Sequence, residues 1–182
     1  MPRPLDDLAA CIRYVREHGE QFGLEDPDCY AVGGFSAGGN LTALWGLKQL
    51  GYKKYGLPKP TAMFPIYSVT DLKLFDGLEE EAVAAFLRTL FGAGWTEEKK
   101  EEYSVLSHMD REYPPCFVAC CKDDATVPYI NSVKLYEKLQ QLHIPAVLEL
   151  GEHGGHGFGD GRFCDLQGWI DRAAAFIDGR EK

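Results

Sequence analysis

Four short apolar runs alternate with helical segments along the chain, and this order constrains the fold more than any other feature. The runs cover 29–35, 61–69, 114–122 and 145–152, and the segments 4–22, 37–51, 127–143 and 163–179 have helical patterns. Strands separated by helices of about ten or more residues pair in parallel through right-handed crossovers. We therefore expect an α/β domain with a parallel sheet of about four strands and helices on both faces.

The chain length predicts one domain with a local insertion. A chain of 182 residues can build one sizeable core but is too short for two ordinary domains, so we expect a single domain over 1–182. The segment 71–109 is polar and helix-prone, and it interrupts the alternation of strands and helices. We interpret it as a small helical cap inserted into the domain. Its aromatic residues are candidates for lining a substrate pocket: Phe75, Phe86, Phe91 and Trp95.

The charge of the chain excludes some classes of partner. The formal net charge is −9, and no run of basic residues offers a patch for nucleic acid or an anionic membrane. A neutral small-molecule substrate fits better. The first fifteen residues include two arginines and two aspartates, so they lack the apolar core of a signal peptide. With six cysteines and no C-x-x-C pair, we expect a cytoplasmic protein without a cofactor.

One pentapeptide carries the strongest indication of chemistry. Gly34, Ser36 and Gly38 match G-x-S-x-G, a turn that presents a nucleophilic serine between a strand and a helix. The pattern predicts that side chains two residues on either side of Ser36 must be absent. A plain strand-to-helix turn is the alternative, but an apolar run precedes this motif and a helical segment follows it, as the nucleophile turn requires.

A nucleophilic serine needs a base and a carboxylate that orients the base. In doubly wound hydrolases these groups follow the serine in the order acid, then histidine, on loops after later strands. The loops after the third and fourth predicted strands are "KDDATVP" and "GEHGGHGFGDG". Both loops are therefore expected at the same edge of the sheet as Ser36.

These stretches resemble the α/β-hydrolase fold, and within it the esterase and lipase group that includes acetyl esterases and polysaccharide-deacylating enzymes. The matching strings are "GGFSAGGNL", the segment from "PPCFVACCKDDATVP" to "PAVLEL", and "GGHGFG". The resemblance implies Asp124 as the acid, four residues before Pro128, with Asp123 as the alternative. It implies His156 of an H-G-F string as the base, with His153 as its competitor. A metal site formed by His153, His156 and Asp160 is a weaker interpretation, because such spacing outside a helix is a poor zinc motif.

The resemblance also shows what is missing from an ordinary member of that group. The backbone N–H of Ala37 is the expected first oxyanion donor, whereas the second comes in this family from an upstream His-Gly-Gly-Gly-type loop. Here the serine is residue 36, and the sequence before it contains neither that loop nor the usual preceding strands. The strand 29–35 would then have an open edge, so we expect a homodimer that covers this edge, through the strand itself or through the first helix.

We therefore predict a carboxylesterase-type serine hydrolase that acts on short-chain acyl esters. Acetylated sugars are one candidate class of substrate. Ser36, Asp124 and His156 are the predicted catalytic residues, Ala37 contributes to the oxyanion site, and Phe35 and Gly34 contact the substrate. Loss of one oxyanion donor lowers the expected turnover. The alternative hypothesis is a truncated, weakly active or inactive hydrolase remnant that acts as a dimeric binding module.

Overall fold

The computed structural model describes residues 2–74, 80–91, 94 and 96–179, and its centre is a four-stranded parallel sheet. The strands are β1 (Ala31–Phe35), β2 (Ala62–Ile66), β3 (Cys116–Cys121) and β4 (Ala146–Gly151). They follow one another across the sheet in the order of the sequence, and each neighbouring pair is parallel. The predicted fold class is confirmed.

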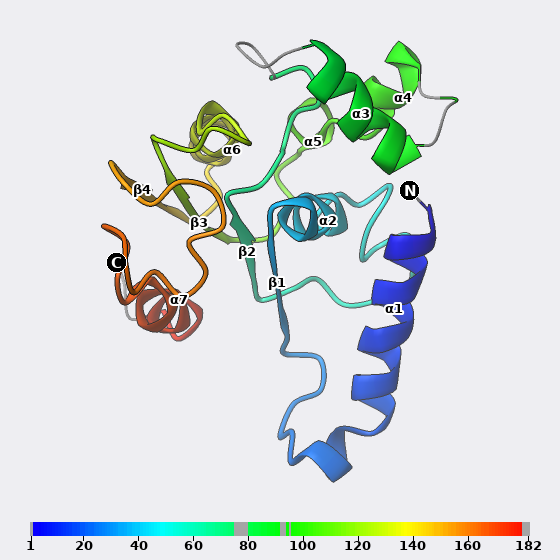
Figure 1. Ribbon diagram of the computed structural model, residues 1–182. Helices are drawn as coiled ribbons and strands as arrows, with labels where there is room; N and C mark the ends of the chain where they lie inside the picture. The colour runs from blue at the N-terminus through cyan, green and yellow to red at the C-terminus, as the bar shows by residue number, and fades with distance from the viewer. Residues whose placement is uncertain (1, 75–79, 92–93, 95, 180–182) are drawn as a thin grey trace.

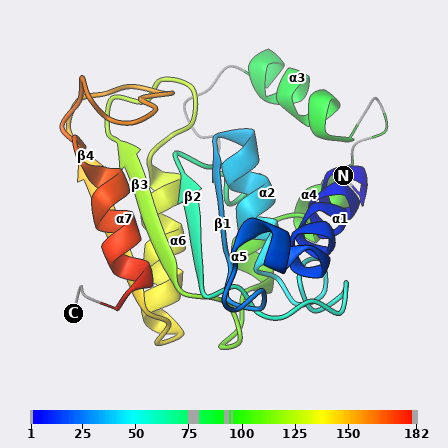
Figure 2. The same ribbon diagram turned by 90° about the horizontal axis from the view of Figure 1, so that it is seen from below.

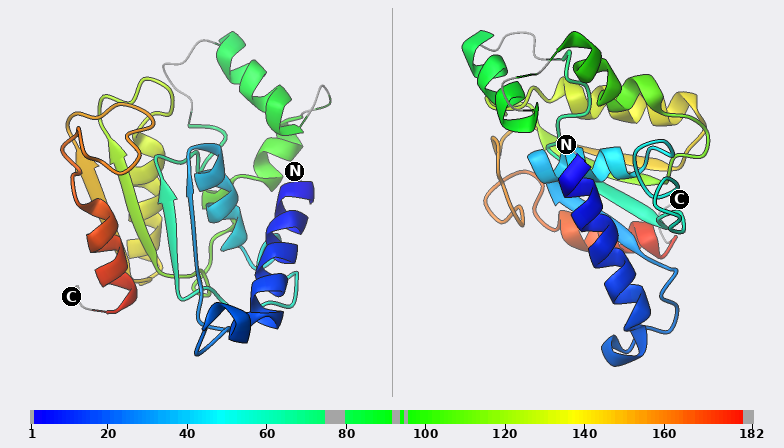
Figure 3. Two further views of the ribbon diagram at one scale, coloured as in Figure 1. Left: turned by 60° about the horizontal axis from the view of Figure 1, so that its bottom comes forward. Right: turned by 90° about the vertical axis from the view of Figure 1, so that its right-hand side faces the viewer.

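Helices cover both faces of this sheet (Figures 1 and 3). On one face lie α2 (Ala37–Trp45) and α6 (Ile130–Gln141), while α7 (Trp169–Ile177) covers the opposite face near β3. The chain begins with α1 (Pro2–Glu17), which packs beside α2 and is followed by a short 3₁₀ helix, η1 (Gly19–Phe22). This arrangement places the loops after β1, β3 and β4 at one edge of the sheet, because the carboxyl ends of parallel strands lie together.

The two faces have separate hydrophobic cores. The larger core joins α1, α2 and α6 to the sheet, and α1 contributes Leu5, Ala9 and Ile12, which are spaced for one side of a helix. The smaller core lies under α7 and includes Ile66, Phe117 and Trp169. β3 is buried along its whole length, as a central strand covered on both faces should be.

α2 and α7 are the helices that fall furthest short of the lengths that the sequence pattern predicts. α2 ends at Trp45 rather than at residue 51, because the chain folds back and the Tyr52 N–H bonds the Trp45 carbonyl oxygen at 3.0 Å. Only glycine fits at position 51, where a Cβ atom would lie 1.8 Å from that oxygen. α7 begins at Trp169 rather than at residue 163, after Gly168 with φ of 80°. The residues before it form turns that contact the loop after β4.

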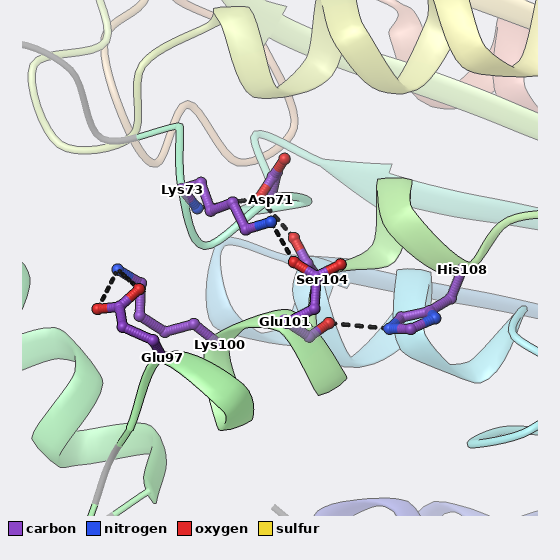
Figure 4. A network of polar contacts seen from close by, with 7 residues as sticks. All are labelled: Asp71, Lys73, Glu97, Lys100, Glu101, Ser104 and His108. Atoms are coloured by element: carbon purple, nitrogen blue, oxygen red, sulfur yellow. Dashed lines mark hydrogen bonds and ion pairs between the residues drawn. The ribbon is translucent and has the colours of Figure 1, made fainter.

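In its described residues, the segment predicted to be a cap contains three helices: α3 (Glu80–Phe91), α4 (Glu97–Glu102) and α5 (Val105–His108). A polar network attaches its second half to the loop after β2 (Figure 4). Ser104 donates to the Asp71 carboxylate, Lys73 pairs with Glu101, and His108 bonds the Glu101 carbonyl oxygen at 2.8 Å. Ser104 itself is fully buried. α4 and α5 are therefore held against the loop that follows β2.

β1 is an edge strand in the part of the chain that the structure describes (Figure 2), since its strand partner there is β2. An apolar groove of about 280 Å³ lies between β1, β2 and α7, and Phe35, Ile170 and Ile177 contribute exposed apolar surface to it.

Candidate active site

Ser36 lies at the junction of β1 and α2. Its φ of 53° is in the left-handed region, which residues with a Cβ atom rarely adopt. The Ser36 N–H bonds the Ile66 carbonyl oxygen of β2 at 3.0 Å, so the ladder between the strands fixes this turn. The hydroxyl group is consequently held at the carboxyl edge of the sheet.

The glycines around Ser36 do not all serve the same purpose. A Cβ atom at Gly34 would lie 2.3 Å from the Gly38 carbonyl oxygen, so the absence of a side chain is required there. A Cβ atom at Gly38 would have no neighbour within 4 Å, which corrects the prediction from the pentapeptide. The second crowded position is Gly39, where a Cβ atom would lie 2.5 Å from the Ser68 Cβ. The turn therefore needs glycine at 34 and 39, where α2 crosses closely over β1 and β2.

Asp124 follows β3, and its carboxylate is held from two sides. The Oδ1 atom accepts hydrogen bonds from the backbone N–H groups of Thr126 and Val127, both at 2.8 Å. The Oδ2 atom faces the His156 Nδ1 atom at 2.7 Å. The side chain is 1% exposed, so its two oxygens make these contacts inside the protein, away from water.

His156 lies between Asp124 and Ser36. Because an ionised carboxylate only accepts hydrogen bonds, Nδ1 carries the proton and Nε2 is the acceptor. The Ser36 Oγ atom lies 2.8 Å from Nε2 and can donate to it. Residues from three loops thus form one chain of hydrogen bonds, and the Ser36 hydroxyl has a base next to it that a carboxylate orients. Such an arrangement can generate an oxygen nucleophile.

Asp123, the alternative acid, has a different position. Its carboxylate accepts the backbone N–H groups of Gly155 at 2.7 Å and Gly154 at 3.2 Å, rather than bonding the His156 ring. The hydrogen bonds from Gly155 and Gly154 lower the pKa of Asp123 below its ordinary value. Two consecutive aspartates therefore act on the same loop: one contacts the imidazole, and the other holds the backbone just before it.

His153 is separated from this arrangement. Its side chain is 83% exposed, and its Nδ1 atom lies 3.8 Å from Asp123 Oδ2. Its backbone N–H and that of Glu152 bond the Asp165 carboxylate, both at 2.8 Å. Because both ring nitrogens of His156 already face Asp124 and Ser36, a metal would have to displace one of these contacts. The geometry gives no support to a metal site at His153, His156 and Asp160.

The remaining predicted residues lie around Ser36. Ala37 is the first residue of α2, so its N–H has no acceptor within the helix and is available to an anion. Phe35 and Gly34 line the apolar groove, on the α7 face of the sheet. Phe75 and Trp95 lie outside the described residues, as do the side chains of Phe86 and Phe91.

Sequence reasoning misses the residues that support the site. The sequence pattern indicates only that Tyr67 fills a core or lines a pocket, yet its ring lies 5.0 Å from the His156 ring. The same kind of pattern places Asp165 in a helix, whereas it holds the loop after β4. The predicted strand 61–69 extends past Tyr67, whereas β2 ends at Ile66, so the sequence pattern gives no signal that Tyr67 lies at the functional edge of the sheet.

Comparison with known proteins identifies the family of this chain. The family model BD-FAE matches residues 1–139. The chain belongs to the BD-FAE family. Two curated relatives match this BD-FAE chain over longer stretches. Endo-1,4-beta-xylanase B of Butyrivibrio fibrisolvens is 24% identical over 173 residues, which are 92% of this chain and 26% of the relative. The probable carboxylic ester hydrolase LipM of Mycobacterium tuberculosis is 26% identical over 150 residues, 78% of this chain and 34% of LipM.

Solved structures show the same architecture. The acetyl ester-xyloside bifunctional hydrolase of Caldicellulosiruptor lactoaceticus superposes with a TM-score of 0.77 at 24% identity, over 97% of this chain and 66% of that protein. This and other matches show that the BD-FAE chain has the α/β-hydrolase fold. It spans about two thirds of the solved relative and about a third or less of the curated ones.

Proposed function

We propose that this chain carries the site of a serine carboxylic-ester hydrolase that acts on short-chain acyl esters. The observation that carries the proposal is the pair of contacts made by His156: 2.8 Å from Nε2 to Ser36 Oγ, and 2.7 Å from Nδ1 to Asp124 Oδ2. Membership of the BD-FAE family supports it, as does the name of LipM, a probable carboxylic ester hydrolase.

In the proposed reaction, Ser36 Oγ attacks the ester carbonyl carbon while its proton passes to His156 Nε2. Asp124 keeps the imidazole oriented through the Nδ1 proton and stabilises the imidazolium that forms. His156 then gives the proton to the departing alcohol, which leaves an acyl group on Ser36. A water molecule, deprotonated by His156, attacks this acyl ester and releases the carboxylic acid, and the proton returns to Ser36.

The oxyanion of each tetrahedral intermediate requires N–H donors. The proposal assigns the Ala37 N–H, at the start of α2, as one donor. Removing one oxyanion donor from a serine hydrolase lowers turnover about 10²-fold to 10³-fold. A site with Ala37 as its single backbone donor should therefore turn over slowly.

The substrate class is proposed from the comparisons and the charge of the chain. One structural relative is named an acetyl ester-xyloside hydrolase, and one curated relative is a xylanase. A chain with a net charge of −9 favours an uncharged ester over an anionic one. We therefore propose acetyl esters of sugars as the first substrates to test, beside p-nitrophenyl acetate as a simple chromogenic ester.

Labelling with a fluorophosphonate probe tests the nucleophile. The wild-type protein should react at Ser36, and Ser36→Ala should abolish the labelled peptide. Asp124→Asn should lower kcat for p-nitrophenyl acetate about 10⁴-fold, because the imidazole would lose its orienting acceptor. Asp123→Asn is the matched control, and it should retain far more activity. Labelling that persists in Ser36→Ala would exclude the proposal.

A second candidate function is a weakly active or inactive relative that acts as a dimeric binding module. The open edge of β1 and the apolar groove beside it favour this alternative. We propose that a second copy of the chain covers this edge. Rapid hydrolysis of p-nitrophenyl acetate that disappears in Ser36→Ala would reject an inactive module, whether or not the protein is a dimer.

A further inference from the structure

Tyr67 has an unusual backbone conformation next to the candidate active site. It directly follows β2 at the edge that presents Ser36, and its φ is 35°, in the left-handed region. A tyrosine is disfavoured there, whereas glycine would not be. The Tyr67 N–H bonds the Ala119 carbonyl oxygen of β3 at 2.7 Å, which holds the residue in place. Strain of this kind is retained where the surrounding structure requires the residue.

The Tyr67 ring is one of four aromatic side chains that contact one another in a cycle. It stacks on Phe35 at 5.5 Å and meets Phe158 edge-on at 4.7 Å, measured between ring centroids. Trp169 completes the set, at 6.1 Å from Phe35 and 6.4 Å from Phe158. We call Phe35, Tyr67, Phe158 and Trp169 the aromatic quartet. The quartet joins the residue before the nucleophile to the loop that carries His156.

Two members of the quartet also hold the backbone of that loop. The Gly159 backbone N–H donates to the Tyr67 hydroxyl oxygen, and the Trp169 indole N–H donates to the Gly159 carbonyl oxygen at 2.9 Å. Burial raises the pKa of Tyr67 above its ordinary value, so the hydroxyl stays protonated at neutral pH. Gly159 lies three residues after His156. The same residue is therefore held by side chains from the end of β2 and from α7.

The loop needs support on this side. Asp123 and Asp165 bind backbone N–H groups of residues 152–155, which precede His156. After His156 the loop contains Gly157, Gly159 and Gly161, all with positive φ. Glycines leave a backbone many accessible conformations, so contacts must select one of them.

We propose that Tyr67 and Trp169 are positioning residues that fix the loop through Gly159 and thereby keep His156 between Ser36 and Asp124. This inference rests on the proposed esterase function. It assigns no contact with substrate to either residue. Their hydroxyl and indole N–H groups act through the loop backbone, and the Tyr67 ring also limits movement of the His156 ring.

The test uses variants that remove one polar atom group and keep an aromatic ring. Tyr67→Phe removes the hydroxyl, and Trp169→Phe removes the indole N–H. Tyr30→Phe is the matched control, because the Tyr30 hydroxyl also bonds the backbone, donating to the Pro58 carbonyl oxygen at 2.7 Å, but it lies before β1 at the opposite edge. Thermal unfolding establishes that each variant is folded, and Trp169→Phe still tests the inference if Tyr67→Phe does not fold.

Two measurements separate positioning from a general structural effect. For Tyr67→Phe and Trp169→Phe, kcat with p-nitrophenyl acetate should fall about tenfold or more with little change in KM, because small misplacements of a catalytic group are costly. The downfield ¹H NMR signal of the His156 Nδ1 proton should be present in the wild type and broaden or shift in both variants. Tyr30→Phe should preserve both readouts.

Either an unchanged kcat or an unchanged resonance in both variants would overturn the inference. Absence of the resonance in the wild type would overturn it as well. Failure of the esterase proposal is recognised separately, because the wild type would then neither hydrolyse the ester nor react with the fluorophosphonate. In that case the resonance alone decides whether Tyr67 and Trp169 position His156.

Discussion

At the scale of single residues, the turn at Ser36 depends on close backbone approach at specific glycines. Gly34→Ala would place a Cβ atom 2.3 Å from the Gly38 carbonyl oxygen, so the backbone of the turn would have to move. We expect this variant to lose about 1–3 kcal/mol of unfolding free energy, as overpacked sites do. Gly38→Ala is the matched change within the same motif. It has open space, and it should leave stability unchanged or raise it by about 0.5–1 kcal/mol.

Urea unfolding monitored by circular dichroism measures both glycine variants. Equal destabilisation by the two substitutions would show that the motif needs both glycines for the same reason, contrary to the contacts described for positions 34 and 38.

Asp123 predicts a pH dependence of stability. The backbone N–H groups of Gly155 and Gly154 lower its pKa in the folded state, so the ionised carboxylate is the stabilising form. The contribution is present above the unfolded pKa of about 3.9, and it is lost as pH falls through the lower folded value. The difference in unfolding free energy between wild type and Asp123→Asn should therefore be constant above about pH 5 and shrink below it.

Urea unfolding at several pH values checks this prediction. Asp7→Asn, which removes an exposed carboxylate from α1, controls for the change in net charge. A difference between wild type and Asp123→Asn that grows towards low pH would contradict the proposed role of the ionised carboxylate.

The G-x-S-x-G motif predicts Ser36 and chain order predicts the two loops, whereas Asp124 and His156 follow from the family resemblance, with Asp123 and His153 as alternatives. The contacts of their supporting residues are not local. Asp123 bonds residues 31 and 32 positions away, and Tyr67 acts on a loop about ninety residues later along the chain. No local pattern distinguishes a carboxylate that orients an imidazole from its neighbour that binds backbone. The catalytic roles themselves stay predictions until the labelling experiment is done.

At the scale of elements, Asn131 joins the start of α6 to the loop after β2. Its Oδ1 atom accepts the N–H groups of Thr70 and Asp71, and its Nδ2 atom donates to the carbonyl oxygens of Leu74 and Pro128. The side chain is fully buried. It therefore connects the loop after β3, which carries Asp124, to the start of the segment 71–109.

Asn131→Ala should be strongly destabilising. A backbone group left buried without a partner costs about 1–3 kcal/mol, and the substitution removes the side-chain partner of the buried Thr70 N–H and of three partly buried backbone groups. We expect a loss of at least about 2 kcal/mol in urea unfolding. Gln140→Ala, on the exposed side of α6, should change stability by less than about 0.5 kcal/mol. Similar losses in the two variants would argue against this role of Asn131.

The order and type of the elements could be predicted because apolar runs and helical periodicity are local properties. The ends of α2 and α7 could not. α2 stops where the chain turns back over Trp45, and α7 starts late because Asp165 bonds the backbone of residues 152 and 153. In both places a contact between distant segments overrides the local preference for helix.

At the scale of the whole molecule, the open edge of β1 predicts self-association. Ile170 is 49% exposed beside the groove, whereas Tyr14 is 55% exposed on α1, the other surface considered for a dimer. A homodimer through the groove should become monomeric in Ile170→Glu, because a buried carboxylate is unfavourable, and should persist in Tyr14→Glu. Sedimentation velocity distinguishes these outcomes. A monomeric wild-type protein at micromolar concentration would reject the dimer.

The Ser36–His156 contact joins residues 120 positions apart in the chain. Closing so large a loop requires the strands between them to be aligned first, since distant contacts form late and slowly. During refolding from denaturant, reactivity towards a chromogenic ester would therefore return after circular dichroism has recovered its helical signal. The delay between the two signals would measure how long the Ser36–His156 contact takes to form after the helices have formed.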